Sequence, residues 1–341
     1  MPHCLSCHLP WSLLDFLFYV TNSRQTAFMH EDSNNRSIRS ASLWVLRLAL
    51  CARAIGLGCS YLWHPMERES NIYGMMYFEW GWPEATALSI ENAGMWFVAI
   101  GAVIVLLMNF VVRNKKEPEA KTWRAIEIAM LAFITLWEIA MAAGLAFRGG
   151  EFLSQWALGS HGLRIAIPAS LLLYATGCGA NAITRVLYVG TVTTFLVHGA
   201  QAWLGSPVFI TMIITTAQTY FDYAMEQSNV ERILKFIGAM DICVVATILL
   251  LAWSTRSKSV LRKVLLGTLL WMAFWGLVTA FGRTTGASFG TFPETLLRLV
   301  HLGGPLVLYL EWSRHLPTGS SVAEPQSNVH PLPTCEQPEP A

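Results

Sequence analysis

Long apolar segments alternate with short polar ones along most of the chain. An apolar run of about 17 to 25 residues is long enough to cross the hydrocarbon core of a bilayer as a helix. Runs of this kind occur at 42–63, 93–112, 125–147, 163–181, 184–204, 233–253, 264–282 and 296–312. The pattern predicts an all-α integral membrane protein with eight transmembrane helices.

The features of residues 42–181 recur in the same order in residues 182–313. The motif Tyr-Phe-Glu-Trp at 77–80 returns as Tyr-Phe-Asp-Tyr at 220–223, which is 143 positions later. An arginine opens the first span of each copy, and a Leu-Arg pair opens the last. A repeat of this length predicts a duplicated four-helix unit. Since four spans is an even number, the two repeats are expected to be parallel-oriented.

The loop charges predict the orientation. The loops at 113–124 and 254–263 hold five and four Lys or Arg residues, whereas the connectors at 64–92 and 205–232 hold one arginine each. Basic loops stay on the cytoplasmic side. We therefore expect both termini to be cytoplasmic in a bacterial inner membrane. The aromatic connectors are predicted to be interfacial or re-entrant elements on the outer face.

Composition agrees with a membrane protein. The chain is 54% hydrophobic and 13% charged, whereas a soluble domain is about 25% charged. The net charge of +1 leaves no basic surplus to neutralise phosphates, which argues against a nucleic-acid partner. The seven cysteines show no disulfide framework.

The two tails differ in kind from the apolar spans. Residues 1–41 form a polar N-terminal tail, and we interpret 1–28 as an over-extended gene start. Residues 314–341 are Pro-rich and are predicted to be disordered. Cys4, Cys7 and His8 make a C-x-x-C-H motif of the c-type haem form. Haem is attached outside the cytoplasm, so we do not expect it on this tail.

Charged residues inside the spans predict two intramembrane polar pairs. At the helical rise, Arg53 lies about 15 Å into its span and Glu138 about 20 Å into its own, so an ion pair is expected. His198 and Asp241 agree in depth to about 3 Å. Each pair has two interpretations, either orientation of helices or a transport or proton-relay role.

Matched polar residues at the outer face predict two further contacts. Glu79 corresponds to Asp222, and Arg164 corresponds to Arg298. Salt bridges Glu79–Arg164 and Asp222–Arg298 would hold each connector over its bundle. A ligand pocket beneath the connectors is the alternative.

Four histidines fall near the outer side, and paired imidazoles can ligate haem b. They are His64, His161, His198 and His301. Their offsets show no ligand spacing, so haem is not expected and quinone remains the open cofactor. No motif predicts a metal site, a nucleotide site or a hydrolase.

The repeated unit resembles the DoxX-like superfamily of four-helix membrane proteins over residues 42–312. The resemblance is carried by Leu46-Arg47-Leu48, Thr184-Arg185-Val186, Gly94, Gly101, Gly238, His198-Gly199 and the stretch 230–253. It implies a link to quinone-coupled sulfur oxidation or to membrane redox complexes, as in some members.

Two classes of function follow, together with a third possibility without chemistry. The first is a quinone-linked, redox-associated subunit whose partner subunit carries the electron-transfer cofactor, because the spans hold no redox cysteine pair. The second is a small-molecule or ion/proton-coupled transporter with its site between the copies. A non-catalytic scaffold is the third. Whether the chain is an enzyme stays open.

Overall fold

The computed structural model describes residues 38–63, 71–113, 116–149, 152–254, 259–285 and 292–314. Helices make up the regular structure in these ranges, and no strand occurs in them. The predicted gene start, the C-x-x-C-H motif and nearly all of the Pro-rich tail lie outside the described residues.

Six of the helices are long and apolar enough to cross a membrane. Their bounds are Ser40–Trp63 (α2), Glu84–Arg113 (α4), Glu117–Arg148 (α5), Ala180–Trp203 (α8), Gln227–Ser254 (α10) and Ser259–Thr285 (α11). Five of them contain an expected span completely, and α8 contains all of the span 184–204 except its last residue. The prediction of an all-α membrane-type fold is therefore supported at the level of these six helices.

The fourth and eighth expected spans are shorter than predicted. They form α7 (Gly162–Ala175) and α13 (Val300–Ser313), of 14 residues each. A 14-residue helix is about 21 Å long, less than the roughly 30 Å hydrocarbon core. Within the described residues only six helices reach span length, so the count of eight is not met. The apolar pattern of the sequence continues across positions at which the helical backbone is interrupted.

Short helices precede both of these 14-residue helices. They are α6 (Ala157–Ser160), after the 3₁₀ turn η4 (Ser154–Trp156), and α12 (Phe292–Arg298). The connectors expected at the outer face are also helical. The first contains α3 (Asn71–Gly74) and the π-helix η3 (Met75–Glu79), and the second contains α9 (Pro207–Phe221).

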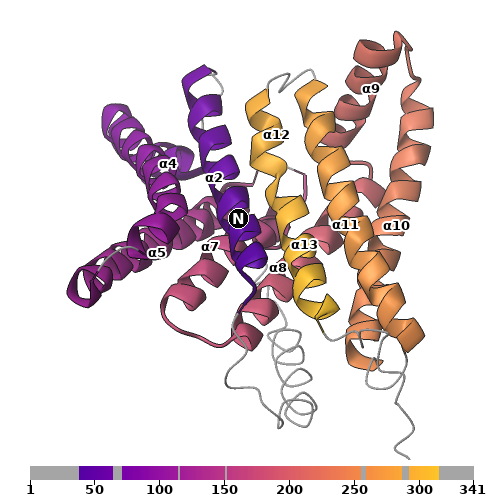
Figure 1. Cartoon of the computed structure of the whole chain (residues 1–341). Coiled ribbons are helices and arrows are strands. Elements are labelled where there is room, and N and C mark those ends of the chain that lie inside the picture. Colours follow the sequence, from indigo (N-terminus) through magenta and orange to yellow (C-terminus); the bar gives the residue numbers. More distant parts are fainter. Residues whose placement is uncertain are drawn as a thin grey trace, which may run out of the picture.

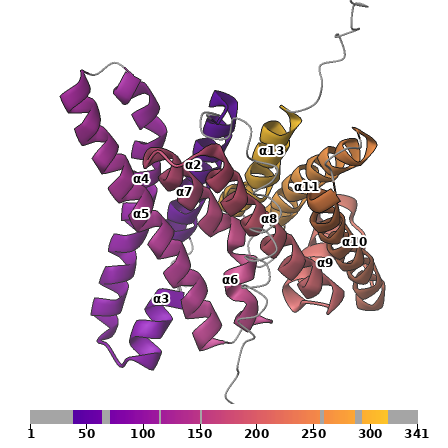
Figure 2. The same ribbon diagram turned by 90° about the horizontal axis from the view of Figure 1, so that it is seen from below.

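The helices form a centre with two flanking groups (Figures 1 and 2). The central helices are α2, α7, α8 and α13, in which α7 packs on α8 and α13 packs on α2. On one side lie α4 and α5, and on the other lie α9, α10 and α11. Segments from the two ends of the chain therefore meet at the centre.

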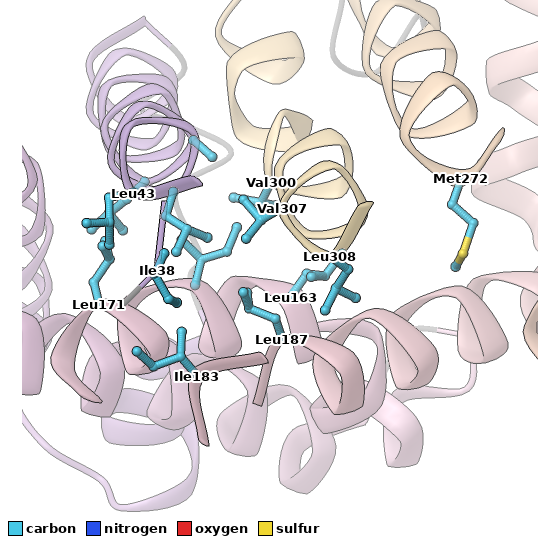
Figure 3. Close-up of a cluster of buried hydrophobic side chains, with 14 of the residues drawn as sticks. Ile38, Leu43, Leu163, Leu171, Ile183, Leu187, Met272, Val300, Val307 and Leu308 are labelled. Carbon is cyan, nitrogen blue, oxygen red and sulfur yellow. The ribbon is translucent and has the colours of Figure 1, made fainter. Parts of the chain in front are cut away.

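Apolar side chains from all four central helices make the core (Figure 3). Leu163 of α7, Leu187 of α8 and Leu308 of α13 are each fully buried at 0% exposure. The α7–α8 crossing is tight, since a Cβ on Gly190 would lie 2.8 Å from the carbonyl oxygen of Gly162. Small residues allow backbones to approach this closely in membranes, where packing drives helix association.

Candidate functional site

Two buried ion pairs join α2 to α5. Arg47 Nη2 lies 2.8 Å from Glu127 Oε1. Arg53 binds Glu138 through two bonds of 2.6 Å each, from Nε to Oε1 and from Nη2 to Oε2. Arg53 and Glu138 were expected to pair because they lie at similar depths in their spans, and the structure shows this pair. Arg53 is 3% exposed and Glu138 1%, so the pair is closed to solvent.

The Arg47–Glu127 pair was missed by the sequence reasoning. Both residues lie inside predicted spans, five and two positions from the end near the basic loop. The depth comparison that matched Arg53 with Glu138 would have found this pair as well. A third buried acid, Glu311 of α13, accepts hydrogen bonds from the Ser42 hydroxyl and from the Arg39 amide. It ties the start of α2 to the end of α13.

A cavity of about 530 Å³ lies within the second half of the chain, between α8, α9, α10, α11 and α13. Its wall is mostly apolar, and a smaller set of polar side chains meets it. The apolar part includes Phe195, Phe209, Met212, Ile213, Leu234 and Val278. The polar part consists mainly of His198, Asp241, Arg283, Arg298 and His301. A concave apolar site with few polar groups is typical of small-molecule binding.

Two glycine contacts position the helices that line this cavity. A Cβ on Gly238 would lie 2.6 Å from the carbonyl oxygen of Gly199, where α10 crosses α8. A Cβ on Gly276 would lie 2.6 Å from the carbonyl oxygen of His301, where α11 crosses α13. The backbones touch at these two points, and the side chains of His198 and His301 are thereby fixed beside α10 and α11.

The two cavity histidines each use one ring nitrogen in a local hydrogen bond. His301 Nδ1 lies 2.9 Å from the backbone oxygen of Arg298, and His198 Nδ1 lies 3.1 Å from Gln201 Oε1. The ring centroids are 5.4 Å apart and the planes are inclined by 63°. Both Nε2 atoms are buried and have no hydrogen-bond partner among the described residues.

Asp241 also lies on the cavity wall, but it does not pair with His198. Its carboxylate accepts a hydrogen bond from the side chain of Trp275, which lines the same cavity. No hydrogen bond or ion pair joins His198 to Asp241 in the described part of the chain. Both residues line one cavity, as their similar depth suggests. His198 forms its hydrogen bond with Gln201, and Asp241 forms its own with Trp275.

The two predicted outer-face salt bridges are not present among the described residues. Glu79 is exposed at the end of η3, and Asp222 is exposed beyond α9, where its carboxylate accepts from Gln218. Arg164 Nη1 instead lies 3.1 Å from His161 Nε2. Arg298 lines the cavity.

Both arginines lie next to a short helix that the sequence did not predict. Both arginines were expected at the mouth of a continuous span. In the structure α6 precedes Arg164, and Arg298 is the last residue of α12. Arg164 therefore lies in the first turn of α7, close to the predicted mouth, whereas Arg298 ends α12, one residue before the break at Leu299.

The remaining candidate residues give no metal centre. His64 lies outside the described residues, and His161 contacts Arg164 in the first half of the chain. No group of three or more His, Cys, Asp or Glu in the described ranges could hold a metal ion. Sequence reasoning also missed Arg283, one residue past the predicted seventh span, and Gln201, which is three residues after His198.

Comparison of the chain with protein-family models, with curated proteins and with solved structures finds no match. The cavity and the residues that line it are the features of the molecule that bear on its function.

Proposed function

We propose that this protein binds a quinone-class molecule from the bilayer in the cavity of its second half, as a quinone-linked subunit of a membrane redox complex. The cavity itself is the observation that carries the proposal. Its volume of about 530 Å³ falls in the range of about 300 to 1,000 Å³ that small-molecule sites occupy.

The lining matches the chemistry of a lipid-soluble quinone. Such a molecule has an apolar ring and tail, which suit the aromatic and aliphatic wall, and two oxygen atoms on the ring. The guanidinium groups of Arg283 and Arg298 are hydrogen-bond donors on that wall, and a quinone oxygen is an acceptor. The imidazoles of His198 and His301 add groups that can hydrogen-bond to the same head.

A quinone changes its redox state only when electrons are supplied or removed. We propose that a partner subunit does this, as the resemblance to DoxX-like proteins implies. The four cysteines in the described residues are free and are not paired with one another. The role of this chain is then to bind and orient the quinone beside its partner.

The same proposal includes the arrangement in the membrane. We propose two parallel four-helix copies in a bacterial inner membrane with both termini cytoplasmic. The element lengths support the two copies: α2 and α8 have 24 residues each, and α7 and α13 have 14 each. An internal proline occurs in both short helices, at Pro168 and Pro305.

The test is to purify the full chain in a mild detergent and to extract the sample with organic solvent. We expect a quinone at near one molecule per chain, measured by chromatography and ultraviolet absorption. Ala217 lies on the cavity wall, so Ala217→Phe should fill the cavity and remove the quinone. Ala93 is exposed on α4 in the other half, so Ala93→Phe is the matched control and should retain it.

Absence of quinone from the wild-type protein, or equal quinone in both variants, would contradict the proposal. A small-molecule carrier is the second candidate, favoured by the carboxylate of Asp241 on the cavity wall. Flux in liposomes that is lost in Asp241→Asn, from protein without quinone, would support the carrier. A protein with neither quinone nor flux would be a scaffold.

A further inference from the structure

We infer that the ligand of this cavity enters and leaves sideways from the bilayer, through the seam between α9 and α11 where Met212 meets Gly282. A seam is here the line of contact between two packed helices. The inference rests on the proposed function and adds the route of the quinone-class molecule. It comes from a difference between the two seams that α9 makes, one with α10 and one with α11 (Figure 1).

The seam between α9 and α10 is filled by apolar side chains. Val230 and Leu234 of α10 are buried there, together with Ala202 at the end of α8. Phe209 and Ile210 are among the side chains of α9 that pack against this cluster. Such packing closes the seam to a molecule from the bilayer along the described residues.

The seam between α9 and α11 is open on both sides of one contact. Thr216 Oγ1 of α9 donates to the backbone oxygen of Gly282 at 3.5 Å, and a Cβ on Gly282 would lie 3.9 Å from Met212 Sδ. One turn before Gly282, Val278 is 39% exposed, and just over one turn after Thr216, Phe221 is 76% exposed. Both of these exposed side chains also line the cavity. A side chain that lines a cavity and reaches the surface marks an opening of that cavity.

The opening beside Val278 faces lipid. It belongs to α11, which is long and apolar enough to cross a membrane. Phe274, Val278 and Phe281 follow one another at helical spacing and therefore share one face, and all three are exposed. Lipid chains are as apolar as such side chains. Val278 thus joins the apolar wall of the cavity to the surface that lipid covers, and an isoprenoid tail can extend from one to the other.

Of the two helices at this seam, α9 is the one placed to move. The backbone of α11 is held against α13, since a Cβ on Gly276 would lie 2.6 Å from the carbonyl oxygen of His301. In contrast, α9 lies between Gly205 and Asp222, which have positive φ angles of 75° and 47°. A sharp turn of the chain therefore separates α9 from α8 and from α10. A helix between two turns, held along one edge by its cluster with α10, can tilt away from α11.

The experiment closes the seam with a reversible bridge. Met212→Cys and Gly282→Cys are combined in the full chain, and a short bis-methanethiosulfonate reagent joins the two thiols. The bound quinone is then displaced by an excess of the same quinone carrying deuterium, and mass spectrometry follows the exchange. We expect the bridge to slow exchange at least about tenfold. Reduction of the bridge in the same sample should restore the rate.

A pair with the same chemistry in the first half of the chain is the matched control. A Cβ on Gly101 of α4 would lie 3.4 Å from Met130 Sδ of α5. The bridge in Met130→Cys/Gly101→Cys should leave the exchange rate unchanged, because neither residue lines the cavity. The wild-type chain treated with the same reagent accounts for its native cysteines, of which Cys178 and Cys243 are exposed.

Uptake gives a second measurement if the two new cysteines lower the quinone content. Ligand-free protein is bridged first and is then mixed with liposomes that contain the quinone. We expect uptake only after the bridge has been reduced.

Each outcome bears on the inference. An exchange rate that the bridge at the seam leaves unchanged, or that both bridges slow equally, would overturn the route and leave the proposed function standing. A bridge that forms in the control pair but not between α9 and α11 would contradict the contact at Gly282 and overturn the route as well. Absence of quinone from the wild-type protein would overturn both proposals.

Discussion

One buried pair of polar residues in each half of the chain differs in how its hydrogen bonds are satisfied. In the first half, the guanidinium of Arg53 and the carboxylate of Glu138 satisfy each other through two bonds. In the second half, His198 and His301 line a cavity, and their Nε2 atoms are buried without a hydrogen-bond partner among the described residues. The Arg53–Glu138 pair is closed to solvent, whereas the two histidines line a cavity of about 530 Å³.

Two tryptophans, Trp137 of α5 and Trp275 of α11, have different surroundings. The ring of Trp137 fills the space beside α4, so that a Cβ on Gly94 would lie 1.9 Å from it. Trp275 instead lines the cavity and donates a hydrogen bond to Asp241. The Trp137 ring packs against α4, whereas the Trp275 ring forms part of the cavity wall. Helices of similar length and composition can therefore form either a packed bundle or the wall of a binding site.

The largest expected effect is the loss of one partner of the closed ion pair. Glu138→Leu leaves the buried Arg53 without its counter-charge and should lower the free energy of unfolding by about 3–5 kcal/mol. Denaturant unfolding in detergent, followed by tryptophan fluorescence, measures this change.

The double variant Arg53→Leu/Glu138→Leu is its control. Two apolar side chains should recover most of the lost stability, and the quinone content should remain at the wild-type level. A double variant that loses its quinone while remaining folded would show that the pair belongs to the binding site.

The next effect is at the crossing of α11 and α13. Gly276→Ala forces the new methyl group against the His301 backbone and should cost about 1–3 kcal/mol, with loss of quinone binding. Gly267 lies on the same helix, and a Cβ there would have no atom within 4 Å. Gly267→Ala should therefore be neutral or slightly stabilising. Similar unfolding curves for the two variants would argue against the tight crossing.

A smaller effect separates the two tryptophans. Trp275→Phe removes the N–H that Asp241 accepts, whereas Trp137 Nε1 is buried with no partner among the described residues. Both changes shrink the ring to the same extent. We expect Trp275→Phe to cost about 1–2 kcal/mol more than Trp137→Phe, as judged by unfolding in detergent. An equal loss of stability in both variants would show that the hydrogen bond between Trp275 and Asp241 does not contribute to the free energy of unfolding.

The smallest expected effect is that of Asp241→Asn. The asparagine oxygen can still accept from Trp275, so the free energy of unfolding should change by less than about 1 kcal/mol. Quinone content should be retained. A large loss of stability in the same unfolding assay would mean that the negative charge of Asp241 holds a positive side chain of the cavity in place.

Part of the candidate site could be read from the sequence, and the reason is local geometry. The depths of Arg53 and Glu138 follow from counting residues along helices of constant rise. His198 and Asp241 were placed at one level by the same count, and both line the cavity. Their hydrogen-bond partners could not be counted in this way, because Trp275 approaches Asp241 from a different helix.

The sequence alone determined the six long apolar helices, because hydropathy and helical rise act over neighbouring residues. The tertiary structure decided that the fourth span ends at Ala175 and that the eighth breaks at Leu299. It also decided where the cavity lies, because contacts between helices far apart in the chain bring the residues of its wall together.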